Sequence, residues 1–396
     1  MSKRGDLYAW LAEAGLRSIP ITELLDGFCA GLGLEDIPVE RVTIAMATLD
    51  PSVRAQSLIW ERGKGSLLET FPHGESNEAW RESPLAMMVR SHTGALRRRL
   101  IDPLVSDDFP LFSELKEQGF TDWTAFIDLF HWEADHVEGG GMGMVSSWMT
   151  QAPSGFSEAQ LQRLRPRIQA LAAAVKSLVA IESACNILST YVGEDAAQRV
   201  LRGAVTRGSV TQTLAVLMFA DLAGFTRYSA EQPIDMTLDT LNRSFDCVGI
   251  AIEKHGGEIL KFIGDGVLAV FMLDESRSNE EVAAGAVDAA EEAQRLLAQA
   301  DLPLDLDIAL HVGRVSYGNI GTARRLDFTV IGRAVNEVAR MEPLCGLLDE
   351  PILISAPLAN LLPGKAKRLR SLGSQALRGL DKMEVFGLTA APPSAS

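Results

Sequence analysis

Residues 214–226 read LAVLMFADLAGFT, and they are the most informative segment of this 396-residue chain. The apolar run is typical of a buried strand, which we expect to end at Asp221, and a Gly-containing turn then leads into a helix. A carboxylate at a strand end can hold a cation, and free amides at a helix start can bind phosphate oxygens. The segment therefore predicts a site for a metal-bound polyphosphate. The amides expected to face the phosphates are those of Leu222, Ala223, Gly224, Phe225 and Thr226.

A second segment, residues 259–271 (ILKFIGDGVLAVF), predicts two strands joined by a tight turn. The Gly-Asp-Gly sequence at 264–266 permits positive φ and places Asp265 at the tip, although an aspartate there is often only a turn former. Two acidic residues on neighbouring strand ends can hold two divalent cations about 4 Å apart, which suits in-line displacement at phosphorus. We therefore expect Asp221 and Asp265 to meet, with Lys261 emerging from the same ladder farther from the tip.

A third segment, residues 327–342 (DFTVIGRAVNEVARME), predicts a short strand that carries Thr329 and is followed by a helix. Asn336 and Arg340 are four positions apart, so they lie on one face of that helix. An amide and a guanidinium stacked in this way could grip a sugar and a phosphate.

The composition limits the class of protein. The chain has 37 Lys+Arg against 52 Asp+Glu, a formal net charge of −15, which argues against a nucleic-acid-binding body. No stretch of about 18 residues is free of charge and no signal core opens the chain, so neither a membrane span nor secretion is expected. The four cysteines have no paired spacing, which argues against disulfides and zinc knuckles. We expect an acidic, soluble, cytoplasmic protein of two domains.

The first 150 residues alternate between helical and strand-like patterns. The pattern predicts helices at 6–16 and 21–33, strands at 41–48 and 56–61, and a hairpin-like pair at 126–133 and 142–149. This order indicates an α+β module with one central antiparallel sheet and a helical insert. The histidines of this region lack ligand spacing, so surface or core roles are expected rather than haem or metal binding. They are His73, His92, His131 and His136.

A long helix should follow. Ser157 to Gln160 matches a capping box, and Pro166 should kink the helix or mark a restart. The seam positions recur every 3.5 residues: Leu161, Leu164, Ile168, Leu171, Val175, Leu178, Glu182 and Cys185. This period favours a dimer-forming signalling helix, with Glu182 interrupting the seam. The alternative is that the face packs on the sheet of its own domain.

Together, and in this order, the three C-terminal segments resemble the class III nucleotidyl cyclase catalytic domain from Leu214 to Leu388. The resemblance includes the strand–Asp–Gly-Phe-Thr opening, the Lys-x-x-Gly-Asp-Gly hairpin, Gly-Asn-Ile-Gly at 318–321 and the Val-Asn-x-x-x-Arg helix. It implies a ferredoxin-like α/β sandwich. No Gly-x-x-x-x-Gly-Lys-Ser/Thr run exists, which excludes a P-loop enzyme.

The resemblance also implies roles for individual residues. Asp221 and Asp265 would bind two Mg²⁺ or Mn²⁺ ions per site, Asn336 would position the ribose, and Arg340 would stabilise charge on the α-phosphate. Arg378, in Leu-Arg-Gly, would hold the terminal phosphates.

The same family uses two side chains for base choice. Lys261 with Thr329 favours ATP, because guanylate-forming members tend to carry Glu and Cys at these positions. The implied function is an adenylate cyclase that makes 3′,5′-cyclic AMP and pyrophosphate, with a guanylate cyclase or a catalytically inactive nucleotide-binding regulator as alternatives. Arg333 departs from the family, in which many members carry Asp after the glycine.

Family members build each site from two subunits, so the resemblance implies a head-to-tail homodimer. The N-terminal part resembles a GAF sensory domain, which could take a small-molecule ligand. The expected organisation is a GAF-like domain at 1–155, a signalling helix at 156–192, a linker or transducer at 193–213, a cyclase domain at 214–390 and a disordered tail at 391–396.

Overall fold

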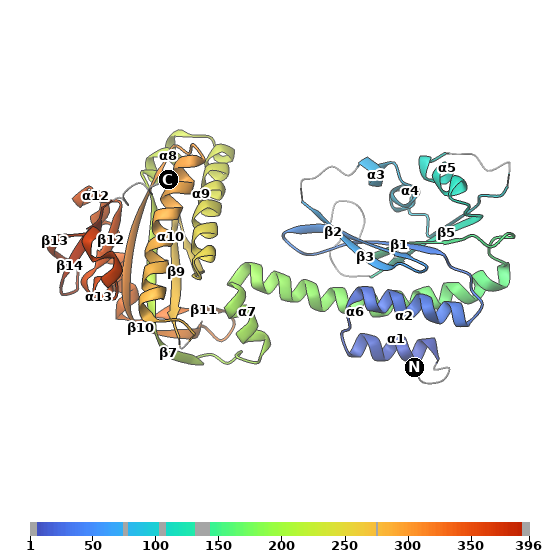
Figure 1. Cartoon of the computed structure of the whole chain (residues 1–396), viewed down its shortest axis with the longest axis horizontal. Coiled ribbons are helices and arrows are strands. Elements are labelled where there is room, and N and C mark those ends of the chain that lie inside the picture. The colour runs from blue at the N-terminus through green and yellow to red at the C-terminus, as the bar shows by residue number, and fades with distance from the viewer. Residues whose placement is uncertain (1–5, 74–77, 103–107, 131–142, 275, 390–396) are drawn as a thin grey trace. The chain divides into compact units, whose positions relative to one another are not determined.

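The computed structural model describes residues 6–73, 78–102, 108–130, 143–274 and 276–389. The chain divides into two compact units, Met1–Thr190 and Tyr191–Ser396 (Figure 1). Each unit packs helices on a sheet, so the expected α+β class is confirmed. Parts of the expected features lie outside the described residues, namely the hairpin tip with His131 and His136, and the tail at 391–396.

Unit 1 is built on a six-stranded antiparallel sheet with the order β3-β2-β1-β6-β5-β4. The strands are β1 (Arg41–Ala47), β2 (Val53–Glu61), β3 (Gly65–Pro72), β4 (Ala95–Arg99), β5 (Asp122–Leu129) and β6 (Gly143–Thr150). One face packs on α2 (Ile21–Leu34) and α6 (Glu158–Val192), and α1 (Leu7–Leu16) packs on these two helices from the side away from the sheet. The other carries α3 (Glu78–Arg81), α4 (Pro84–Ser91) and α5 (Pro110–Glu117).

The expected helices and strand pairs of unit 1 are present, and β3 and β4 are additional. Both are edge strands with few buried residues, so they lack the alternation that reveals a half-buried strand. His73 and His92 are exposed, as expected for surface residues.

Most of the expected seam of helix α6 lies in the core of unit 1. Its capping box is present, since the Ser157 N–H donates to Gln160 Oε1 at 2.9 Å and the Gln160 N–H donates to Ser157 Oγ at 3.3 Å. The helix continues through Pro166 without a restart. Five seam residues are buried in the core of unit 1: Leu164, Ile168, Leu171, Val175 and Leu178. This part of the seam therefore packs on its own domain, because α1, α2 and the sheet already cover it.

Among the described helices, α6 alone has the length and apolar composition that a membrane crossing would require. Many of its apolar residues contact the sheet and helices of unit 1, as the core helix of a folded domain does.

Unit 2 contains a larger sheet with the order β13-β14-β12-β10-β7-β9-β8, and β11 pairs with β10. The strands are β7 (Val210–Ala223), β8 (Glu258–Ile263), β9 (Gly266–Leu273), β10 (Asp305–Gly321), β11 (Leu326–Ile331), β12 (Ile352–Ser355), β13 (Leu369–Ala376) and β14 (Lys382–Leu388). Strand β7 is central and buried on both faces, since Val216 and Met218 enter one core while Ala215 and Leu217 enter the other. Burial on both sides explains its unbroken apolar run.

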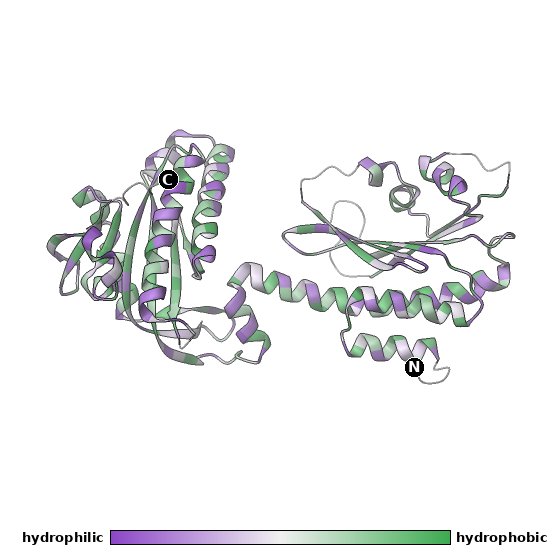
Figure 2. Cartoon of the chain, viewed as in Figure 1, coloured by the Kyte–Doolittle hydropathy of each residue, from purple (hydrophilic) through white to green (hydrophobic). Residues whose placement is uncertain are grey.

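Helices cover both faces of this sheet. One core includes residues of α9 (Ile234–Lys254), α10 (Asn279–Gln299) and α13 (Ala356–Ala359), with α8 (Phe225–Glu231) packed against it. The other includes residues of α7 (Glu194–Leu201), α11 (Arg333–Met341) and α12 (Leu344–Leu348). A 3₁₀ helix, η1 (Pro363–Arg368), precedes β13. Figure 2 shows hydrophobic and hydrophilic residues alternating along α9 and α10, as in helices that bury one face.

The segment expected as a linker, residues 193–213, is part of unit 2. It contains α7, whose Ala196 and Ala197 are buried, and it includes the start of β7 at Val210. The segment was expected to be a linker because it is polar, and α7 buries only two small residues, which leave little apolar pattern in the sequence.

Candidate metal and nucleotide site

The structure brings Asp221 and Asp265 to one place. Pairing between β7 and β9 ends at Ala220 and Val267, so Asp221 is level with the β8–β9 turn that holds Asp265. A Cβ atom added to Gly266 would lie 3.0 Å from Asp221 Oδ1. Glycine at this position therefore leaves room for the Asp221 carboxylate against the turn.

Two further carboxylates crowd this pair. Asp307 of β10 lies opposite Asp221 in the strand register, and Glu342 follows α11. Burial, followed by Asp265 and Asp307, raises the pKa of Asp221 to about 6. Burial, followed by Asp221, Asp307 and Asp265, raises the pKa of Glu342 to about 7. No ion pair within the described ranges joins any of the four to a lysine or an arginine.

This arrangement fits divalent cations that also contact substrate. No group of three or more His, Cys, Asp or Glu in the described residues could hold a metal ion by itself. Mg²⁺ in phosphate-transfer sites is commonly held by one or two carboxylates together with substrate phosphates and water. Asp221 and Asp265 would supply that carboxylate pair, and a bound cation would relieve the repulsion between them.

The strand that carries Asp221 is longer than expected. It extends to Ala223, because Leu222 and Ala223 continue the ladder opposite Leu306 and Asp305 of β10. Leu222 is buried. The turn and the first residues of α8 are therefore only 224–226, with Gly224 at φ 82° as the N-cap.

Lys261 lies at an irregularity in the hairpin. Pairing with β9 shifts between Ile259 and Lys261, and such a bulge redirects side chains. Lys261 Nζ forms an ion pair with Asp327 Oδ2 of β11. Thr329 is two residues farther along β11, hence on the same face as Asp327. Lys261 and Thr329, the pair expected to contact the base, therefore both lie at β11 of the same chain: Thr329 belongs to this strand, and Lys261 is paired with its Asp327.

Asn336 and Arg340 occupy the exposed face of α11. The opposite face of this helix is buried against the sheet through Ala334, Val338 and Met341. The two polar side chains thus project away from the core of their own unit.

Arg378 lies in the turn between β13 and β14. Three residues later, Asp381 Oδ2 accepts from Arg333 Nη2 at 2.6 Å, so this turn is anchored beside the start of α11. Arg333 Nε also donates to Glu337 Oε1 at 2.8 Å. The unusual arginine is therefore neutralised by two carboxylates.

Asp307, Asp327 and Glu342 were not singled out from the sequence. Predicting Asp307 as part of the site would have required knowing that β10 pairs with β7 in this register. Asp327 and Glu342 flank the Thr329–Arg340 segment, and the only local signal that could have identified them was their negative charge.

Residues 210–390 match the model of the adenylate and guanylate cyclase catalytic domain family. The C-terminal unit carries a class III cyclase catalytic domain. Domains of this family are lyases that act on a nucleotide substrate and generally use divalent metal ions. The resemblance inferred from the three sequence segments is thereby confirmed for this part of the chain.

Two curated relatives match part of the chain. An uncharacterized protein of Mycobacterium tuberculosis is 29% identical over 218 residues, which cover 50% of this chain and 39% of that protein. An adenylate cyclase of Anabaena cylindrica is 33% identical over 156 residues, covering 37% of this chain and 30% of that enzyme. The chain thus spans well under half the length of these relatives.

Solved structures similar to this chain include the adenylyl cyclase CyaB from P. aeruginosa. It has 25% identity and a TM-score of 0.42, and the match covers 48% of this chain and 100% of that chain. A bacterial light-regulated adenylyl cyclase has 20% identity and a TM-score of 0.48, and covers 64% of this chain and 83% of that chain.

Proposed function

We propose that the cyclase domain converts ATP to 3′,5′-cyclic AMP and pyrophosphate at a site shared by two copies of the chain. The observation that carries this proposal is the convergence of Asp221 and Asp265 on the β8–β9 turn, with no cationic partner among the described residues. A phosphate-transfer site needs such a pair to hold its cations beneath a triphosphate.

In the proposed reaction the ribose 3′-oxygen bonds to the α-phosphorus, the hydroxyl proton is lost, and the bond from the α-phosphorus to the bridging oxygen breaks to release pyrophosphate. Bound Mg²⁺ or Mn²⁺ would lower the pKa of the 3′-hydroxyl and neutralise the phosphates. Asn336 would orient the ribose. Arg340 would stabilise charge on the α-phosphate, which is worth on the order of 3–4 kcal/mol for one well-placed donor. Arg378 and the amides of 224–226 would bind the remaining phosphates.

ATP is the proposed substrate because of the side chains available for base contact. Lys261 would donate to adenine N1, and Thr329 would accept from the 6-amino group. The ion pair with Asp327 supports this role, because it directs Lys261 toward the strand that carries Thr329. A hydroxyl can both donate and accept, so discrimination against GTP should be incomplete.

Exposed apolar side chains on β8 and β11 support the proposed homodimer. Phe262 and Ile263 at the end of β8, with Leu326 and Ile331 on β11, are 40–51% exposed in the single chain. Exposed apolar groups on β8 and β11, the strands that carry Lys261 and Thr329, suit a surface that a second copy covers.

We further propose that unit 1 is a GAF-like sensory domain and that the protein acts in the cytoplasm. The six-stranded antiparallel sheet supports the first point, as does a groove of about 640 Å³ between β4, β5 and α6 that could admit a small molecule.

The experiment that tests the activity is incubation of the purified chain with Mn²⁺ and either ATP or GTP, followed by chromatographic separation of products. The proposal expects 3′,5′-cyclic AMP and pyrophosphate in equal amounts, with less product from GTP. Preferred turnover of GTP would indicate a guanylate cyclase. Nucleotide binding without product would indicate an inactive regulator.

A further inference from the structure

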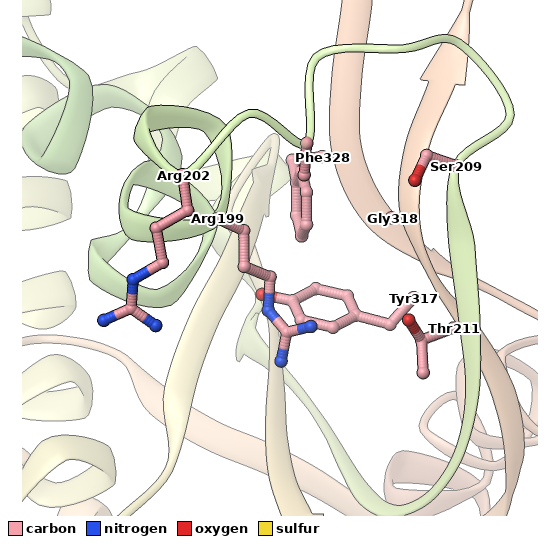
Figure 3. Close-up of a pocket in the computed structure, with 8 residues that line it drawn as sticks. Arg199, Arg202, Ser209, Thr211, Tyr317, Gly318 and Phe328 are labelled. Atoms are coloured by element: carbon pink, nitrogen blue, oxygen red, sulfur yellow. The ribbon is translucent and has the colours of Figure 1, made fainter.

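We infer that a second pocket of unit 2, apart from the cyclase site, binds a small phosphate-bearing anion. The pocket has a volume of about 180 Å³ and lies between α7, the start of β7, the end of β10 and β11 (Figure 3). That volume corresponds to about six water molecules at liquid density. It suits a phosphate group rather than a whole nucleoside triphosphate.

The pocket and the proposed base-reading residues use different faces of β11. Phe328 lines the pocket and is buried, whereas its neighbours Asp327 and Thr329 belong to the other face. A ligand in the pocket would therefore touch β11 from behind the proposed cyclase site.

Two arginines of the α7 region provide positive charge to one side of the pocket. The Arg199 guanidinium carbon lies 5.1 Å from the centre of the Tyr317 ring, and Arg199 Nε donates to Asp195 Oδ2 at 2.5 Å. Arg202 donates to the neutral Gln198 Oε1 at 3.2 Å, and within the described ranges no carboxylate pairs with it. Arg202 therefore keeps an uncompensated charge and spare donors, which suit phosphate oxygens.

The other walls complete a polar cradle over an aromatic base. Ser209 and Thr211 lie across the pocket from the arginines, and their hydroxyls can donate to an oxyanion (Figure 3). Tyr317 and Phe328 are buried and packed edge to face, with ring centres 4.8 Å apart. Aromatic packing makes this base rigid, so the pocket is formed before a ligand enters.

Several arginines flank the open side of the pocket, while the carboxylates of Asp195 and Glu258 lie against Arg199 and Tyr317. Residues 199–209 (RVLRGAVTRGS) contain three arginines and no acid, and Arg324 and Arg325 lie at the β10–β11 turn. Backbone bonds hold these segments together, because the Gly208 N–H donates to the Asn319 carbonyl at 3.0 Å. These flanking arginines favour anions at the pocket although the chain has a net charge of −15.

The test uses the full chain in EDTA, so that no divalent ion can recruit phosphate to Asp221 and Asp265. Inorganic phosphate is titrated at constant ionic strength set with chloride, and binding is followed by calorimetry and by hydrogen exchange. We expect saturable binding that slows amide exchange in α7 and at 209–211. Ribose 5-phosphate, which lacks the adenine that Lys261 and Thr329 are proposed to contact, forms a second arm. If this ester binds more tightly than inorganic phosphate, the ligand is the phosphate group of a larger molecule. If the two bind equally, the ligand is free phosphate.

Arg202→Ala should weaken phosphate binding about tenfold or more. The affinity of Arg202→Lys should fall between those of the unmodified chain and Arg202→Ala, because lysine keeps the charge but not the planar guanidinium. Arg295→Ala, an exposed arginine of α10, and Arg340→Ala should bind as the unmodified chain does. Absence of saturable binding, unchanged affinity in Arg202→Ala, or loss of binding in Arg340→Ala would overturn the inference. None of these outcomes depends on cyclase activity.

Discussion

Asp221 lies where burial and two other carboxylates raise the free energy of its charged form. Its pKa is raised to about 6 by burial first, and then by Asp265 and Asp307. Like charges on directly opposite strand positions normally destabilise a sheet, so Asp307 opposite Asp221 needs a compensating role. Metal binding beneath a triphosphate supplies one, because the cations would neutralise the cluster.

Protons should therefore compete with metal at this site. Asp221 must lose its proton to bind a cation, so turnover at subsaturating Mn²⁺ should fall as the pH drops through about 6. Asp307→Asn removes one negative neighbour, lowers the pKa of Asp221 and should shift this acidic limb to lower pH. Asp305→Asn is the control, because Asp305 raises the pKa of Asp307 but is not among the causes for Asp221. Identical pH profiles for all three proteins would contradict this explanation.

Single residues also show where sequence reasoning stops. The Gly-Asp-Gly turn and the Asp221 strand were predictable because turn chemistry and apolar runs are local. The contacts of Lys261 with Asp327 and of Arg333 with Asp381 connect residues 66 and 48 positions apart, and no local pattern specifies such pairs.

At the scale of elements, α7 is attached to the cyclase domain through Glu258 at the start of β8. The Asp195 N–H donates to Glu258 Oε1 at 3.1 Å, which satisfies a free amide of the first turn of α7. The Tyr317 hydroxyl donates to Glu258 Oε2 at 3.4 Å. Gly193 is required before the helix, because its φ is 90° and a Cβ there would approach Glu258 Oε1 to 2.7 Å. Glu258 is thus both a helix cap and the first residue of the strand that carries Lys261.

Glu258→Ala should loosen α7. The change removes the cap and one of the two carboxylates that the Tyr317 hydroxyl contacts, at a cost of about 1–3 kcal/mol, while Asp195 remains beside that hydroxyl. Amide exchange in α7 should accelerate, and the unfolding transition of unit 2 should move to lower urea concentration. Glu253→Ala, an exposed residue of α9, should leave both measurements unchanged. Equal exchange of α7 in the two variants would exclude the capping role.

The α6 helix shows why element existence is easier to predict than element partners. Its cap, length and apolar stripe are local properties and were predictable. About three heptads cannot separate a 3.5-residue seam from the broader stripe of a helix packed on its own sheet. The structure assigns the stripe from Leu164 to Leu178 to the core of unit 1.

At the scale of the whole molecule, the proposed site needs two chains. Asp221→Ala would lack a metal ligand and Arg340→Ala would lack the phosphate-stabilising guanidinium. Mixing the two inactive proteins should restore about one quarter of full activity, since half of randomly exchanged dimers are mixed and each has one complete site. Product formation against mixing ratio measures this. Mixed dimers without activity would show that the site is not shared.

The division of the chain at 190/191 predicts that regulation and catalysis are separable. Deleting residues 1–190 keeps α7 and the whole cyclase domain. The shortened chain should still make cyclic AMP at a severalfold different rate, because the deletion removes the proposed sensory domain and its effect on the catalytic domains. Steady-state rates of both proteins at equal dimer concentration measure the difference. An unchanged rate would argue against a sensory role.

The convergence of Asp221 and Asp265 supports every catalytic step proposed for this protein. Cyclic AMP production by Asp265→Ala with saturating Mn²⁺ and ATP tests it most directly, with Asp239→Ala, an exposed residue of α9, as the matched control. Sedimentation of both variants verifies that dimers persist. We predict that Asp265→Ala loses at least about a hundredfold in turnover, as expected for loss of metal-ion catalysis, while the control keeps full activity. Full activity in a dimeric Asp265→Ala protein would contradict the two-metal account.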